Sequence, residues 1–211
     1  MNQNQVKWLA AALMLIDHIG LMLEAEPMRI IGRLSFPLFS WVFAQNWKRP
    51  GDKKALITRL ILFGVLSQIP HMLLFGNLEL NIMFSFAAAA VTLSYIRRFD
   101  DRKIAVLSTG LVSAQILGVS YGWYAVACPL LMIRWKEGGG SRLWWFGWTI
   151  ANIGYTISCK SWIQIFAIFA PLVLAYYDTS KDQKPTTLEK RFFYYFYPLH
   201  LGGLAALRTI V

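Results

Sequence analysis

Acidic side chains are scarce in this sequence, and cysteine is almost absent. The 211 residues include 11 Asp and Glu against 21 Lys and Arg, and only two cysteines. Cys128 and Cys159 are far apart in the expected topology, so we expect no disulfide between them. No Cys and His spacing is typical of a zinc site, and no Gly-rich loop carries the Lys-Ser/Thr pair of a nucleotide-binding loop. The sequence therefore offers no recognisable metal or nucleotide-phosphate motif.

Long apolar stretches are abundant instead. Hydrophobic residues make up 56% of the chain, and the mean hydropathy is +0.45. A membrane-spanning helix needs about 20 mostly apolar residues. No linker separates the stretches, so we expect an all-α polytopic membrane protein that forms a single domain over residues 1–211. About nine spans are predicted, at residues 7–24, 29–46, 55–75, 80–96, 104–118, 121–135, 142–158, 161–177 and 191–210.

Lysine and arginine gather in alternate connections between these spans. The basic connections lie near residues 48–54, 97–103, 136–142 and 178–191. Because cytoplasmic loops carry an excess of Lys and Arg, these four connections are predicted to be cytoplasmic. The N-terminus is then cytoplasmic and the C-terminus outside. The same rule explains most of the formal net charge of +10, so we expect a lipid bilayer and no nucleic acid as partner.

The first apolar stretch carries two titratable groups near its middle, Asp17 and His18. An ionisable group at membrane depth costs a few kcal/mol, and helix formation does not require it. Arg33, early in the second stretch, is the expected counter-charge for Asp17. Adjacent helix positions point about 100° apart, so Asp17 can face Arg33 while His18 faces elsewhere. This arrangement indicates an anchoring ion pair beside a candidate general base.

A second histidine is predicted at a matching depth. His200 lies about 14 Å from the inner end of the last span, and His18 about 16 Å from the inner end of the first. The match suggests one buried site built from both ends of the chain, and histidine is the natural general base near neutral pH. A lone amide in a helix bundle more often holds helices together than binds a ligand, which is the expected role of Gln115, Asn152 and Gln164.

The first hundred residues resemble the TraX family, whose founding member is the pilin acetylase of conjugative plasmids. The resemblance rests on four segments in order, and more loosely on Tyr197-Pro-Leu-His200. The four segments are Lys7-Trp-Leu-Ala with Met14-Leu-Ile-Asp17-His18-Ile-Gly20, Ile31-Gly-Arg33-Leu-Ser-Phe-Pro37-Leu-Phe39, Arg59-Leu-Ile-Leu-Phe with Ser67-Gln-Ile-Pro70, and Leu80-Asn81-Ile82.

The family implies an acetyl-CoA-dependent N-acetyltransferase in the bacterial inner membrane that acts on the pilin N-terminus. The sequence is also similar to membrane acyltransferases of the acyltransferase-three type, which carry an arginine eleven positions before an essential histidine. Here Lys7 stands eleven before His18. Eleven residues are about three helical turns, so both side chains share one face. Lysine lacks the bidentate fork of arginine, which weakens the expected phosphate contact.

These observations predict a membrane acyltransferase that uses acetyl-CoA as acyl donor and no metal. His18 would be the general base, Asp17 and Arg33 would set the geometry, and His200 would be a second base or an acyl carrier. The acceptor, pilin or another envelope molecule, would bind near His71, Asn81 and Tyr197. The donor phosphates would meet basic residues near the cytoplasmic face, namely Lys7, Lys48, Arg49, Lys53, Lys54 and Arg59.

Two other classes of protein are compatible with parts of the pattern. Buried Asp, His and Arg also mark proton relays in small transporters or proton-coupled channels. No inverted repeat and no paired broken helices are visible in the sequence, although transporters often have them. A non-enzymatic envelope assembly factor is a third alternative. It does not explain why the chain places Asp17 and His18 at membrane depth, where ionisable groups cost free energy.

The charge pattern makes a prediction about topology. A reporter that is active only in the cytoplasm should be inactive when fused after Val211, because the C-terminus is predicted to lie outside. The same reporter fused at Asp100, within a basic connection, should be active and serves as the control. Clear cytoplasmic activity at Val211 would refute the orientation.

Overall fold

The computed structural model describes residues 1–135 and 140–209, and these are arranged as α-helices and 3₁₀-helices without a β-strand. Part of the predicted connection 136–142 and the C-terminal Val211 lie outside the described residues. The chain divides into two compact units, Met1–Asn46 with Leu131–Thr186 (unit 1) and Trp47–Leu130 with Thr187–Val211 (unit 2). The single-domain expectation stays a prediction.

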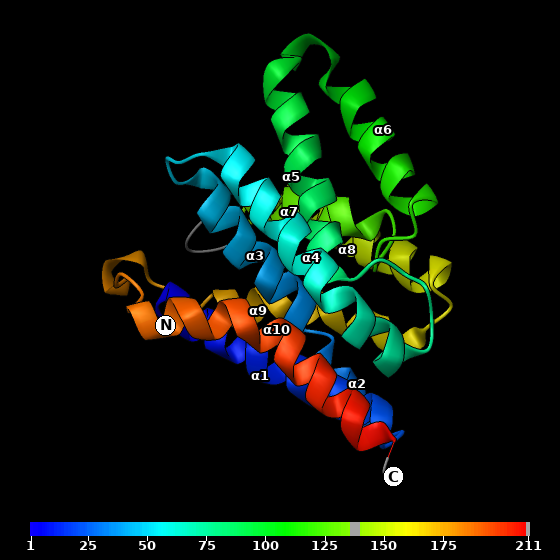
Figure 1. The fold of residues 1–211 in the computed structure, drawn as a ribbon. Coiled ribbons are helices and arrows are strands. Elements are labelled where there is room, and N and C mark those ends of the chain that lie inside the picture. The colour runs from blue at the N-terminus through cyan, green and yellow to red at the C-terminus, as the bar shows by residue number, and fades with distance from the viewer. Residues whose placement is uncertain (136–139, 210–211) are drawn as a thin grey trace. The chain divides into compact units, whose positions relative to one another are not determined.

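Unit 1 is built around its N-terminal helix. Asn2 caps this helix through a capping box with Gln5, in which each side chain accepts a hydrogen bond from the other residue's backbone. The helices of unit 1, several of which are labelled in Figure 1, are α1 (Gln3–Met22), α2 (Glu26–Gly32), most of α3 (Ser35–Lys48), the end of α7 (Tyr124–Ile133), α8 (Arg142–Ser158), η2 (Trp162–Phe169), α9 (Ala170–Leu174) and η3 (Thr179–Lys181).

Two glycines allow α1 and α2 to pack closely. A Cβ atom on Gly20 would lie 2.7 Å from Cβ of Met28, and one on Gly32 would lie 2.3 Å from Cβ of Asp17. Carbon atoms do not approach this closely, so neither position has room for a larger residue. The contact at Gly32 brings the C-terminal end of α2 directly against the Asp17 side chain.

Unit 2 contains the longest helix of the chain, α4 (Lys53–Phe75), which packs against α5 and α10. Asp52 caps its N-terminus, and Gly76 ends it in a left-handed conformation with φ of 67°. The other helices are α5 (Ile82–Arg98), η1 (Asp100–Arg102), α6 (Lys103–Ile116), most of α7 and α10 (Thr187–Arg208). A small core of Ala114, Val119, Ala125 and Val126 packs beneath the α6–α7 connection.

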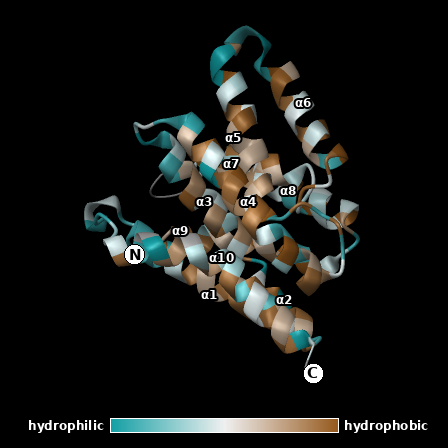
Figure 2. Cartoon of the chain, in the orientation of Figure 1, coloured by the Kyte–Doolittle hydropathy of each residue, from teal (hydrophilic) through white to brown (hydrophobic). Residues whose placement is uncertain are grey.

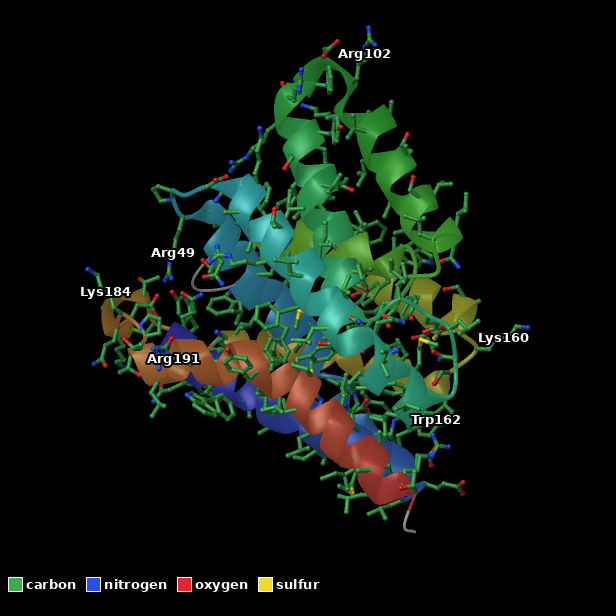
Figure 3. The ribbon with its side chains drawn as sticks, in the orientation of Figure 1. Arg49, Arg102, Lys160, Trp162, Lys184 and Arg191 are labelled. Atoms are coloured by element: carbon green, nitrogen blue, oxygen red, sulfur yellow. The ribbon has the colours of Figure 1, made fainter. Side chains whose placement is uncertain are left out.

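The turn between α5 and α6 is hydrophilic, whereas both helices carry hydrophobic residues (Figure 2). The two helices bend by 115° at this break. Arg102 lies at the tip of the hairpin, as Figure 3 shows, within a connection that the sequence predicts to be cytoplasmic.

Within the described part of the chain, α1 and α4 are long and apolar enough to cross a membrane, and α5 with α6 would make a third span if the bent pair counts as one. These helices indicate a membrane-associated protein. The predicted count of nine spans and the positions of the termini are not confirmed. Predicted span 142–158 coincides with α8, whereas 29–46 is divided into α2 and α3, and 161–177 into η2 and α9. Gly32 ends α2, and the following Arg33 and Leu34 form the turn.

Because of the close contact at Gly32, we expect a single added methyl group there to destabilise the protein. Gly32→Ala should destabilise the protein by about 1–3 kcal/mol, because α1 and α2 must separate to make room. The free energy of unfolding in mild detergent measures this change. Gly203→Ala is the matched control, since a Cβ atom there meets nothing within 4 Å and alanine favours the helix. Equal stability of both variants would contradict the packing described here.

Candidate functional site

A buried carboxylate with two arginines lies in unit 1. Nη2 of Arg33 donates to both carboxylate oxygens of Asp17, and Nε of Arg29 lies 3.2 Å from Asp17 Oδ1. The residue Asp17 is 8% exposed, although the Arg29 side chain keeps 21% exposure. The sequence predicted the pairing of Asp17 with Arg33, and the structure brings these two side chains together. Their catalytic role stays a prediction.

Gln164 joins the same group from helix η2. Nη1 of Arg33 donates to Gln164 Oε1 over 3.3 Å, and Gln164 is only 3% exposed. We call Asp17, Arg29, Arg33 and Gln164 the Asp17 cluster. The sequence predicts that Gln164 holds helices together and predicts no role for Arg29. The four-residue spacing of Arg29 and Arg33 was the available signal, since it places both on one side of a helix. Nothing local in the sequence indicates Gln164.

His18 follows Asp17 on α1 and is half-buried. The helical twist of about 100° per residue turns it away from the direction of Asp17. Lys7 lies on the same face of α1 as His18, three turns earlier, and Ala11 and Met14 occupy the positions between them. Both intervening side chains are buried. The part of this face between Lys7 and His18 is therefore covered by other parts of the protein.

His200 belongs to unit 2, so its predicted pairing with His18 stays a prediction. Its ring stacks on Phe196 with centroids 4.5 Å apart. Nδ1 lies 2.8 Å from the carbonyl oxygen of Phe196, and because a carbonyl only accepts, Nδ1 must carry the proton. This hydrogen bond selects the neutral tautomer with the lone pair on Nε2, which is the form that a base or nucleophile requires.

Five of the six predicted donor-binding residues lie at the start of unit 2, whereas Lys7 belongs to unit 1. Nζ of Lys53 donates to the carbonyl oxygens of Trp47 and Arg49, both over 2.7 Å, and so fixes the turn between α3 and α4. Arg59 donates to the carbonyl of Ala55 in its own helix. Desolvation lowers the pKa of the Lys48 ammonium below its ordinary value. Lys54 is exposed, and Figure 3 shows Arg49 at this turn.

Arg97 also lies near this turn, although the sequence did not predict it. Cζ of Arg97 lies 5.4 Å from the ring centroid of Trp47, and Nζ of Lys53 lies 5.2 Å from the same ring. Trp47 is 2% exposed. Two positively charged side chains therefore lie near one buried aromatic ring. This convergence of two cations near one aromatic ring is a feature that can attract an anion.

The three predicted acceptor-binding residues all lie in unit 2. Asn81 caps α5 and donates to the carbonyl oxygen of Gly64 over 2.7 Å. Tyr197 is buried and hydrogen-bonded to the backbone of Ile82. His71 is 5% exposed, and its Nδ1 has no hydrogen-bond partner among the described residues. The structure therefore gives Asn81 and Tyr197 structural contacts and leaves a ring nitrogen of His71 available to a ligand.

Across residues 1–135 and 140–209, no group of three or more His, Cys, Asp or Glu side chains could hold a metal ion. Together, the apolar helices and the buried Asp17 cluster define a membrane-associated helical protein with a charged site in unit 1.

Residues 2–208 match the profile of the family described as TraX protein, and the chain belongs to this family. It is 35% identical over 122 residues to the protein TraX of Escherichia coli, a stretch that covers 56% of this chain and 49% of that protein. An uncharacterized protein of Rickettsia prowazekii is 40% identical over 98 residues, covering 45% of this chain and 38% of the relative. The chain thus spans about half the length, or less, of these two relatives.

A more distant relative matches over almost its whole length. The probable fimbrial assembly protein FimC, serogroup H1, of Dichelobacter nodosus is 22% identical over 237 residues, covering 98% of this chain and 96% of the relative. No solved structure matches the chain significantly.

The Asp17 cluster predicts unequal effects of its two arginines. Arg33→Ala should cost about 3–5 kcal/mol, because it leaves the buried Asp17 carboxylate without its main partner. Arg29→Ala should cost less, since this side chain is more exposed and Arg33 remains. Thermal and chemical unfolding of both variants in the same detergent measures the difference. An Arg33→Ala variant as stable as the parent would show that the ion pair does not hold α1 to α2.

Proposed function

We propose that this protein is a membrane acetyltransferase that moves an acetyl group from cytoplasmic acetyl-CoA to an amine or hydroxyl acceptor at the membrane or its outer side. The observation that carries the proposal is the charge-paired Asp17 directly beside His18. Two arginines hold the Asp17 carboxylate. The neighbouring imidazole of His18 is the group that we propose for proton transfer.

The reaction follows from these roles. With an amine acceptor, the nitrogen attacks the thioester carbonyl carbon, a C–N bond forms and the C–S bond breaks. His18 takes the proton that the nitrogen loses and passes it to the sulfur, so coenzyme A leaves as the thiol. Arg33 supports the negative charge that develops on the carbonyl oxygen. His200, with its lone pair on Nε2, is the candidate for a second base or for an acyl carrier.

The donor is proposed to bind on the basic cytoplasmic side. Lys53 and Arg97 converge on Trp47, and Lys48, Arg49 and Lys54 lie close to Lys53 in the chain. Phosphate groups favour such clusters of Lys and Arg. Lys7 and Arg59 are the other two residues that we propose as contacts of the donor. The protein would then be a multi-pass protein of the bacterial inner membrane.

The proposed acceptor is a pilin or another envelope protein. Membership of the TraX family supports a role linked to conjugation and pili. The name of the Dichelobacter nodosus relative, a probable fimbrial assembly protein, is consistent with this class of acceptor. We place the acceptor near His71, whose Nδ1 has no partner among the described residues, with Asn81 and Tyr197 as supporting groups. The same name also favours a second candidate function, that of a non-enzymatic assembly factor.

Substitution of His18 tests the proposal. His18→Ala should reduce acetyl transfer from acetyl-CoA about 10²–10⁴-fold while leaving acetyl-CoA binding largely intact, because most contacts of the ligand lie elsewhere. His18→Gln keeps a polar side chain but cannot accept the proton in the same way, so it should be equally impaired. Radiolabelled transfer and donor binding are measured with matched amounts of folded protein in lipid nanodiscs.

The outcomes separate chemistry from packing. If His18 only packs helices together, Ala destabilises the protein, Gln restores it, and turnover follows the amount of folded protein. Near-normal turnover by folded His18→Gln would end the assignment of this histidine as the base. His200 would then be the next residue to replace.

A further inference from the structure

The Asp17 cluster contains a buried donor that the protein itself does not use. Nε2 of Gln164 is fully buried and has no hydrogen-bond partner among the described residues. Its orientation follows from chemistry, because Arg33 Nη1 can only donate, so the atom that faces it must be the amide oxygen Oε1. The NH₂ end of Gln164 therefore points away from the guanidinium. Leaving such a buried donor unsatisfied is unfavourable, which calls for a ligand or a function.

Two guanidinium groups lie in the same cluster. Those of Arg29 and Arg33 both approach the carboxylate of Asp17. Guanidinium groups in a largely buried site favour an anionic oxygen nearby. The 21% exposure of the Arg29 side chain leaves one side of the cluster accessible to a small group.

From these two observations we infer that Gln164 Nε2, together with Arg33, binds an acyl oxygen, namely the carbonyl oxygen of the donor as it gains negative charge. This inference rests on the proposed acetyltransferase function for its catalytic meaning. The binding site itself, for a carboxylate or an oxyanion of acetyl size, does not depend on that function. Gln164 is then a substrate-contacting residue rather than an amide that only holds helices together.

Gln164→Glu separates the two roles of this side chain. A glutamate keeps the oxygen that accepts from Arg33, and its charge strengthens that contact, but it cannot donate to a ligand. Gln164→Leu removes both the acceptor and the donor. Gln115→Glu, in α6 of unit 2, is the matched control, because Gln115 Oε1 likewise accepts a hydrogen bond, from the backbone of Trp123.

The first measurement is independent of turnover. Acetate, compared with chloride at equal ionic strength, should raise the thermal unfolding midpoint of the parent protein, since a ligand that binds the folded state stabilises it. Gln164→Glu should fold at least as stably as the parent but bind acetate about tenfold more weakly or worse. Gln115→Glu should respond to acetate like the parent. The inference is overturned if acetate does not stabilise the parent protein, or if it stabilises Gln164→Glu equally.

The second measurement is acetyl transfer. Loss of an oxyanion donor should lower kcat about 10²–10³-fold in Gln164→Glu with little change in the KM for acetyl-CoA. If Gln164 only supports Arg33, Gln164→Glu keeps full turnover and only Gln164→Leu is impaired, which overturns the inference while the acetyltransferase function stands. If acetate binding depends on Gln164 but the parent transfers no acetyl group, the oxygen site stands and the proposed function fails.

Discussion

The ion pair between Asp17 and Arg33 is the interaction on which the N-terminal unit depends. A carboxylate in a largely buried position requires a counter-charge within reach, and Arg33 supplies it from the turn that follows α2. That turn can reach Asp17 only because Gly32 presents no side chain toward α1. The short α2 helix, the glycine at its end and the arginine after it thus together bring the counter-charge to Asp17.

The same requirement gives the adjacent residues Asp17 and His18 different roles. Arginines fix Asp17 in place, whereas His18, one position later, points in a different direction and is half-buried. The ion pair makes Asp17 an anchor between α1 and the turn after α2. An imidazole such as that of His18 can both accept and donate a proton. The arginines of the cluster then suit the oxygen that becomes negative during acyl transfer.

The sequence predicted those features that follow from short-range patterns or from the cost of buried charge. The all-helical class, the exact limits of α8 and the meeting of Asp17 with Arg33 are of this kind. The breaks within predicted spans 29–46 and 161–177 were missed, because apolar composition does not distinguish one long helix from two short ones. Gln164 was missed because its partner Arg33 is 131 residues away, a separation over which no local pattern operates. The anchoring of Lys53 to backbone carbonyls could not be predicted, because it depends on the three-dimensional path of the turn between α3 and α4.

Coenzyme A release from acetyl-CoA supplied on one side of the membrane tests the central claim most directly. The purified protein is reconstituted in liposomes with known orientation, and free thiol is followed over time with a primary amine acceptor present. Our account predicts thiol release when the donor meets the basic side that carries the residue 48–54 turn, and none when the donor meets only the other side. Absence of thiol release from either side by folded protein, above all if solute or proton flux is seen instead, would contradict it.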